Sequence, residues 1–152
     1  MKFKLLGALA KKADIIELTN SIIKLESGHR DCPWIFVIPK AKNNGNLTDL
    51  TSEEQAKLFE DLSLASDVMK ELFSPNRINI ALIGNKTPQL HAHIVCRYEK
   101  DPYWPETIWG KPESPLSEKE TLYLAQKIRK KFLKKQKIYL TPNSPTSYDT
   151  VT

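Results

Sequence analysis

The run Trp34-Ile-Phe-Val-Ile38 constrains the fold more than any other part of the sequence, because it is continuously apolar and lies between Pro33 and Pro39. A short apolar run closed by residues that interrupt regular structure is typical of a strand buried in the middle of a sheet. The run is also far below the roughly 18 residues that a membrane span requires. We therefore expect a buried central strand and no membrane segment.

Further strands are predicted on both sides of this run. β-Branched residues gather at 15–18 and again at 22–25, which predicts two strands separated by a turn or bulge. Residues 77–83 alternate apolar with other side chains, and residues 90–97 form another strand-like run. The alternating apolar side chains of the first of these two runs are Ile78, Ile80 and Leu82.

Two helices are predicted from capping boxes, at Thr51-Ser-Glu-Glu54 and at Ser117-Glu-Lys-Glu120. Apolar residues at spacings of three and four follow each box, so each helix has one apolar face. The first helix is expected to end near Ser74-Pro75, because proline cannot continue an α-helix. The two apolar faces consist of Leu58, Leu62, Ala65, Met69 and Leu72, and of Leu122, Ala125, Ile128 or Arg129, and Phe132.

These elements predict an α+β fold, an antiparallel sheet of four to six strands with two main helices. The 152 residues, 40% of them hydrophobic, have the size and composition of one domain, which we place at residues 1–140. Residues 141–152 are rich in Pro, Ser, Thr and Asn, which predicts a mobile tail. Cys32 and Cys96 are too few for a disulfide framework and no leader-like segment is recognised, so we expect a cytoplasmic protein.

The positive charge of the chain is concentrated in one segment. The net charge is +5, but Lys127 to Lys137 holds seven basic and no acidic residues, and the rest of the chain has a net charge of −2. Basic side chains near a helix C-terminus interact favourably with the helix dipole, so a solvated helix face is the favoured interpretation. A weak site for nucleic acid or another polyanion stays open as the alternative.

His91 and His93 are the strongest candidates for chemistry. They are two residues apart in a strand-like run, so both imidazoles should lie on the same face of a sheet. A hydrogen-bonded structural pair and a metal site are the other interpretations of such a pair. Strand alternation sends Cys96 to the opposite face, which leaves no third metal ligand, and we expect no metal and no cofactor.

The segment Asn79-Ile-Ala-Leu-Ile-Gly-Asn-Lys-Thr-Pro-Gln-Leu-His-Ala-His-Ile-Val-Cys-Arg97 resembles the signature of the histidine triad (HIT) family of nucleotide hydrolases and transferases. In that family three histidines alternate with apolar residues. Here Gln89 stands at the first position, and His91 and His93 at the second and third. Pro33-Trp-Ile-Phe-Val-Ile-Pro-Lys40 is similar to a family strand that ends in Ile-Pro-Lys. The resemblance covers residues 14–110 and is nearest to bacterial hydrolases of diadenosine polyphosphates.

The resemblance implies nucleotidyl transfer at an α-phosphorus, with His91 as nucleophile and a nucleotide as the substrate. A neutral imidazole nitrogen is nucleophilic near pH 7, and a covalent intermediate divides one difficult displacement into two easier ones. His93 is expected to donate a hydrogen bond to a phosphate oxygen or the leaving group, and Asn85 and Asn79 to offer N–H donors to the same oxygens. Gln89 can form hydrogen bonds but cannot take up a proton.

Three further expectations come with the family. His29 lies near the position where the family contacts the ribose, with a surface histidine as the other interpretation. The loop with Trp104 and Trp109 covers the site or a partner subunit, or only anchors itself on the core. A homodimer and a dinucleoside polyphosphate such as diadenosine tetraphosphate are implied. The alternative function is a nucleotide-binding module that has lost turnover with the first histidine.

Overall fold

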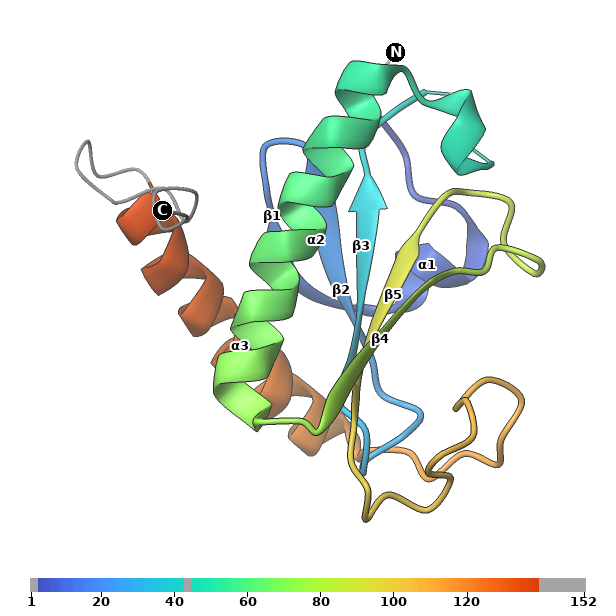
Figure 1. Ribbon diagram of the computed structural model, residues 1–152, viewed down its shortest axis with the longest axis vertical. Helices are drawn as coiled ribbons and strands as arrows, with labels where there is room; N and C mark the ends of the chain where they lie inside the picture. Colours follow the sequence, from blue (N-terminus) through green and yellow to red (C-terminus); the bar gives the residue numbers. More distant parts are fainter. Residues whose placement is uncertain (1–2, 43–44, 140–152) are drawn as a thin grey trace, which may run out of the picture.

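Strand β3 lies in the middle of an antiparallel sheet, as the apolar run predicts. The computed structural model describes residues 3–42 and 45–139, and within them the sheet has five strands in the order β1-β2-β3-β5-β4 (Figure 1). The predicted α+β fold is confirmed. The strands are β1 (Ala13–Glu17), β2 (Ser21–Glu26), β3 (Trp34–Pro39), β4 (Arg77–Leu82) and β5 (Ala92–Arg97), and the helices are α1 (Gly7–Lys11), α2 (Ser52–Phe73) and α3 (Glu118–Tyr139).

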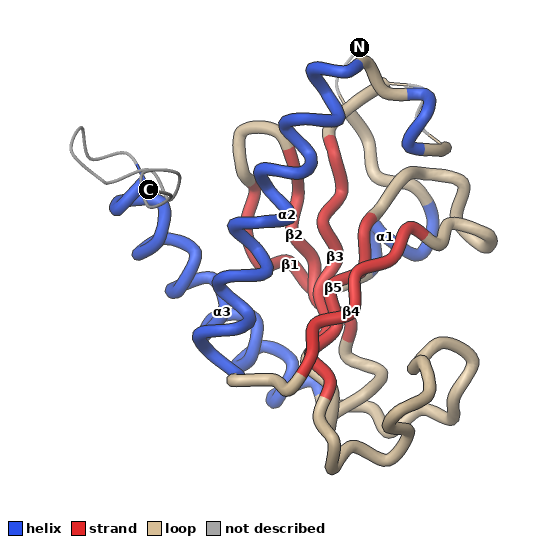
Figure 2. Tube along the Cα trace, in the orientation of Figure 1, coloured by secondary structure: helices blue, strands red, loops and turns tan. Residues whose placement is uncertain are grey.

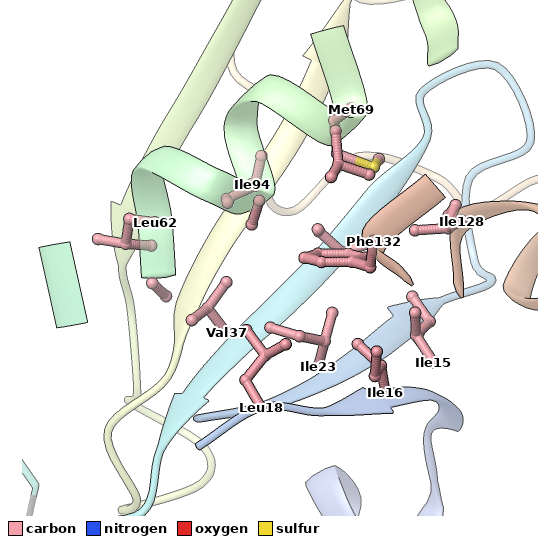
Figure 3. Packing of buried hydrophobic residues seen from close by; sticks show 14 of the residues in the cluster. Ile15, Ile16, Leu18, Ile23, Val37, Leu62, Met69, Ile94, Ile128 and Phe132 are labelled. Atoms are coloured by element: carbon pink, nitrogen blue, oxygen red, sulfur yellow. The ribbon is translucent and has the colours of Figure 1, made fainter. Parts of the chain in front are cut away.

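The two long helices cover one face of this sheet (Figure 2). Alternate residues of the central strand, Ile35 and Val37, join the core beneath these helices. Figure 3 shows Met69 of α2 and Phe132 of α3 packed over strand side chains such as Ile94. The histidine strand is therefore attached to a rigid, closely packed layer.

The opposite face of the sheet is covered by the N-terminal segment, which includes α1, and by the loop between β5 and α3. Leu9 of α1 packs against Phe36 and Ile38 of β3. At the first residue of β3, Trp34 packs with Ile108, which belongs to the loop between β5 and α3. His91 and His93 lie on this second face.

The first long helix begins and ends where the sequence predicts. Thr51 caps α2, since its hydroxyl accepts from the Glu54 amide at 3.1 Å while the Glu54 carboxylate accepts from the Thr51 amide at 2.9 Å. The helix stops at Phe73, before the left-handed Ser74 and Pro75. Leu58, Leu62, Ala65 and Met69 are buried, and Leu72 is half-buried.

The expected apolar face of α3 is partly wrong. Ala125, Ile128 and Phe132 are buried as predicted, but Leu122 is 58% exposed. A step of three residues falls about 60° short of a full helical turn, so the row 122, 125, 128 drifts around the helix. Leu122 is at the end of that row and leaves the core.

Strand β4 is present, but the apolar side chains that alternate along it are not all buried. The strand pairs with β5 and lies at the edge of the sheet. Ile78 packs on the main core, whereas Ile80 is 49% exposed and Leu82 is 41% exposed. Residues 141–152, where a mobile tail is predicted, lie outside the described residues. No helix within the described ranges is long and apolar enough to cross a membrane.

Candidate active site

The two histidines lie side by side on the sheet face that points away from α2. His93 is in β5 and His91 immediately precedes this strand, while Ala92, Ile94 and Cys96 alternate into the core beneath the helices. The centroids of the two imidazole rings are 4.8 Å apart, and both side chains are less than 10% exposed. The strand thus holds both rings in one largely water-excluded place.

The hydrogen bond of His91 decides which of its ring nitrogens carries the proton. Its Nδ1 is 2.6 Å from the backbone carbonyl oxygen of Gln89. A carbonyl oxygen only accepts, so Nδ1 must donate and the neutral ring must have its lone pair at Nε2. The edge of Phe36, 5.7 Å away between ring centroids, further restricts the ring. His91 therefore has a fixed orientation and one basic nitrogen that no described hydrogen bond uses.

His93 has the opposite tautomer. Its Nδ1 accepts from the indole Nε1–H of Trp34 at 3.2 Å, so its Nε2 carries the hydrogen and donates to the Ile83 carbonyl at 3.1 Å. Burial is the main cause that lowers the pKa of His93 to about 4, with a smaller contribution from the neighbouring His91. The ring is thus neutral at pH 7.

This arrangement differs from the role expected for His93. Donation to a phosphate oxygen or a leaving group needs a free N–H, but the only N–H of the neutral ring points to the Ile83 carbonyl. The reason is long-range: β3 brings Trp34 beside His93, and the end of β4 brings Ile83. Neither contact follows from the spacing of the two histidines.

A cavity of about 420 Å³ opens beside His91. It is lined by His91, Gly84, Asn85 and the segment 45–48, together with Leu82 and Leu90. A Cβ atom added to Gly84 would lie 3.2 Å from the Thr87 carbonyl oxygen and 3.8 Å from His91 Cε1. The glycine therefore lets the loop pass close to the imidazole. A larger hollow of about 600 Å³ lies on the first turns of α3 and contains no histidine.

Gln89 contacts a part of the chain for which the sequence predicts no element. Its side-chain Oε1 accepts from the Leu6 amide at 2.9 Å, and its Nε2 donates to the Lys4 carbonyl at 3.0 Å. The side chain is 5% exposed. Gln89 therefore binds the N-terminal segment, and its backbone carbonyl binds His91. No local sequence signal indicates an interaction over more than 80 residues.

Asn79 lies apart from the histidines. In the pairing of β4 with β5 it is opposite Val95, two residues along the strand from Ala81, which is opposite His93. Its Oδ1 accepts from the guanidinium of Arg97 at 3.3 Å. The structure therefore places Asn79 in a buried polar cluster and does not bring it to the cavity.

That polar cluster anchors the loop with the tryptophans. Arg97 and Asp101 form two hydrogen bonds of 2.8 and 3.0 Å, and Asp101 also accepts from the amides of Tyr98 and Tyr103. Burial alone would raise the pKa of Asp101, but Arg97 and the two amides outweigh it and hold this pKa well below the usual range. Trp104 lies 5.9 Å from the Arg97 guanidinium. Asp101 is thus a charged anchor of this loop at neutral pH.

Aromatic rings connect this loop with the histidines. Trp109 packs edge-on against His93, with centroids 5.5 Å apart, and against Trp34 at 5.6 Å. Its indole N–H is buried and has no hydrogen-bond partner among the described residues. His29 stacks on Trp34 at 5.6 Å with an interplanar angle of 26° and is half-buried. Trp109 therefore covers the His93 side of the pair, and His29 is part of an aromatic cluster.

The two cysteines contribute no thiolate. Burial raises the pKa of Cys32 and of Cys96 to about 12. In the described part of the chain, no three His, Cys, Asp or Glu side chains come together as candidate ligands of a metal ion. The groups at the cavity that are suited to chemistry are therefore the imidazole of His91 and the amide of Asn85.

Comparison with known proteins agrees with this geometry. The family model described as HIT domain matches residues 15–100. The structure of a histidine triad protein from Bradyrhizobium japonicum superposes with a TM-score of 0.80 at 28% identity, over 87% of this chain and 99% of that one. A histidine triad protein from Marinobacter aquaeolei gives 0.81 at 29% identity, over 88% and 98% of the two chains.

A curated relative from Saccharomyces cerevisiae, a bis(5'-adenosyl)-triphosphatase, is 31% identical over 70 residues. That match includes 43% of this chain and 34% of the yeast protein, so the similarity spans about a third of the length of the relative. The family model, in contrast, matches more than half of the chain and contains both histidines. This chain belongs to the HIT family.

Proposed function

We propose that this protein is a hydrolase of nucleoside polyphosphates or nucleotide conjugates, of the dinucleoside polyphosphate type, which acts through His91. The observation that carries the proposal is the 2.6 Å contact between His91 Nδ1 and the Gln89 carbonyl. In the neutral form of the ring, this contact leaves the lone pair at Nε2, and a nucleophile requires such a lone pair. The HIT family membership and the name of the yeast relative support the choice of substrate.

The reaction takes place in two displacements. In the first, His91 Nε2 forms a bond to the α-phosphorus while the bond from this phosphorus to the leaving group breaks; a leaving phosphate takes the bonding electrons, and a leaving amine also takes a proton from water. In the second, water forms a P–O bond and gives up a proton to the solvent, the N–P bond breaks with its electron pair returning to Nε2, and the mononucleotide leaves the neutral imidazole. The Nδ1–H to carbonyl bond keeps the ring in place throughout, and it stabilises the positive charge on the imidazole of the intermediate.

The surroundings of the cavity suit a phosphate group in part. Asn85 lines the cavity with His91 and carries an amide that can donate to phosphate oxygens. Trp109, whose buried indole N–H has no partner in the described residues, packs against His93 and is not part of the cavity lining. His93 holds Trp34 and Ile83, and we assign it a positioning role.

A nucleotide-binding module without turnover is the second candidate. Gln89 cannot take up a proton, and both nitrogens of His93 already have protein partners. These two observations remove two of the proton donors that a leaving group could use. The candidates differ in product formation, since both predict nucleotide binding.

The test is a screen of purified protein against dinucleoside polyphosphates and nucleoside phosphoramidates, with products separated by chromatography. His91→Ala should lower turnover by about 10⁴-fold or more. Tyr123→Ala is the control and should turn over like the wild type, because Tyr123 is 70% exposed and outside the cavity lining. An acid-free quench should trap a nucleotide on wild-type protein and none on the His91 variant. Binding without products would favour the module, and near-normal turnover of the His91 variant would refute the mechanism.

We further propose a cytoplasmic homodimer. Ile80 and Leu82 expose apolar surface on the edge strand β4, where backbone groups are also available for pairing, and a second copy of the chain would cover both. Cys32 and Cys96 are free thiols, in agreement with a reducing compartment. Light scattering that reports a monomer at all concentrations would contradict the dimer.

A further inference from the structure

The N-terminal segment, residues 3–12, is bound to the histidine face at two places. At its first residues, Gln89 accepts from the Leu6 amide and donates to the Lys4 carbonyl. At its end, the amine of Lys24, only 4% exposed, donates to the carbonyls of Ala10 at 3.4 Å and Lys12 at 3.1 Å. Both attachments are made by buried side chains, Gln89 before β5 and Lys24 in β2.

Between these attachments the segment packs against the surroundings of the histidines. Leu9, 3% exposed, contacts Phe36 and Ile38 of β3. The Phe36 ring lies edge-on to both imidazoles, at 5.7 Å from His91 and 5.1 Å from His93. The segment therefore supports the ring that borders both histidines.

We propose that Gln89 is a positioning residue that couples this segment to His91, an inference that rests on the function proposed above. Its side-chain amide holds Lys4 and Leu6, and its backbone carbonyl holds the Nδ1–H of His91. Because one residue makes both sets of contacts, the docked segment fixes the Gln89 backbone, and this backbone fixes the tautomer and the direction of the imidazole.

The amide is specifically suited to this task. It presents a donor and an acceptor side by side, as a peptide group does in a pair of strands, and here it pairs with one carbonyl and one amide of the same segment. A carboxylate has no donor for the Lys4 carbonyl, and an apolar side chain has neither group. Gln89→Glu and Gln89→Met therefore remove one and both of these hydrogen bonds at similar side-chain length.

The first readout is independent of activity. Hydrogen exchange at the Leu6 amide should be about tenfold or more faster in Gln89→Met, because its acceptor is lost. In the same variant, ¹⁵N NMR of His91 should change from one tautomer to a mixture. Lys24→Met is the matched control, since it releases the other end of the segment and should leave the His91 tautomer as in the wild type.

The second readout is kinetic. Misplacement of the imidazole should lower kcat of Gln89→Met by about 10- to 100-fold with a smaller change in KM. In Gln89→Glu, burial raises the pKa of the new carboxyl, and its protonated form can again donate to the Lys4 carbonyl. The ratio of its kcat to that of the wild type should therefore rise as the pH falls from 8 to 6, while the ratio for Gln89→Met stays flat.

The results separate this proposal from the proposed function. A single unchanged His91 tautomer in Gln89→Met, with or without faster Leu6 exchange, overturns the coupling. If wild-type protein cleaves no nucleotide, the exchange and NMR results still decide whether Gln89 positions His91. If Gln89→Met does not fold, ¹⁵N NMR of His91 in Gln89→Glu decides at high pH, where the ionised carboxylate cannot donate to the Lys4 carbonyl, and a single unchanged tautomer there refutes the proposal.

Discussion

The buried neutral His93 should make the stability of this protein sensitive to acid. Its pKa is lowered from 6.5 to about 4, chiefly by burial and secondarily by His91, while the hydrogen bond to Ile83 opposes the shift. Between these two pH values the unfolded chain takes up a proton at this site and the native chain does not. The contribution to stability is therefore complete above pH 6.5 and is lost as the pH falls toward 4.

The magnitude follows from the two pKa values. Each tenfold change in proton affinity corresponds to about 1.4 kcal/mol, so the full loss is about 3 kcal/mol, of which roughly 2 kcal/mol falls between pH 7 and pH 4.5. Because His93 is only 7% exposed, solvent screening reduces this figure little. For a domain of this size such a loss is a large part of the total stability.

The assay is urea unfolding of the wild type and of His93→Asn at several pH values between 7 and 4.5. Titrating groups that both proteins share, such as Asp101, contribute nearly equally and cancel in the difference between the two free energies of unfolding. The wild type should lose roughly 2 kcal/mol relative to the variant over this range. A difference that is constant with pH, or that moves in favour of the wild type in acid, would refute the argument.

Two further changes test the supports of the site. Asp101→Asn leaves Arg97 buried without its charged partner, and the protein should lose about 3–5 kcal/mol of its free energy of unfolding, measured with urea. Glu106→Gln, on the exposed side of the same loop, is the control and should change this free energy little. Gly84→Ala places a methyl group 3.2 Å from the Thr87 carbonyl and 3.8 Å from His91, so kcat should fall several-fold with little change in melting temperature; an unchanged kcat would mean that this approach is not needed.

The strands and helices follow from local patterns because local physics determines them. The run before Pro39 has no polar residue to place toward solvent, so it becomes the central strand, and the two capping boxes start helices one residue after Thr51 and Ser117. Alternation also places His91 and His93 on one face, since a strand allows only two directions. Burial of β4 and of Leu122 is not determined locally, because it depends on what covers each position.

The details of the candidate site depend on contacts between distant parts of the sequence. Trp34 is 59 residues from His93, and Gln89 is 83 residues from Leu6. Residue spacing cannot indicate such pairs, although the contact with Trp34 decides which nitrogen of His93 carries the hydrogen. Closeness in the sequence is no better guide for Asn79. It is near the histidines in the sequence, but the register of β4 places it with Arg97.

The opposite tautomers of the two histidines explain why one is suited to chemistry and the other to support. On both rings the N–H is directed at a backbone carbonyl, Gln89 for His91 and Ile83 for His93. The difference lies in the remaining lone pair, which is taken up by Trp34 in His93 and is without a described partner in His91. A phosphorus atom can only be attacked through a lone pair that is not already used. Under the proposed mechanism, the position of one indole N–H therefore gives unequal roles to two identical side chains on the same face of the sheet.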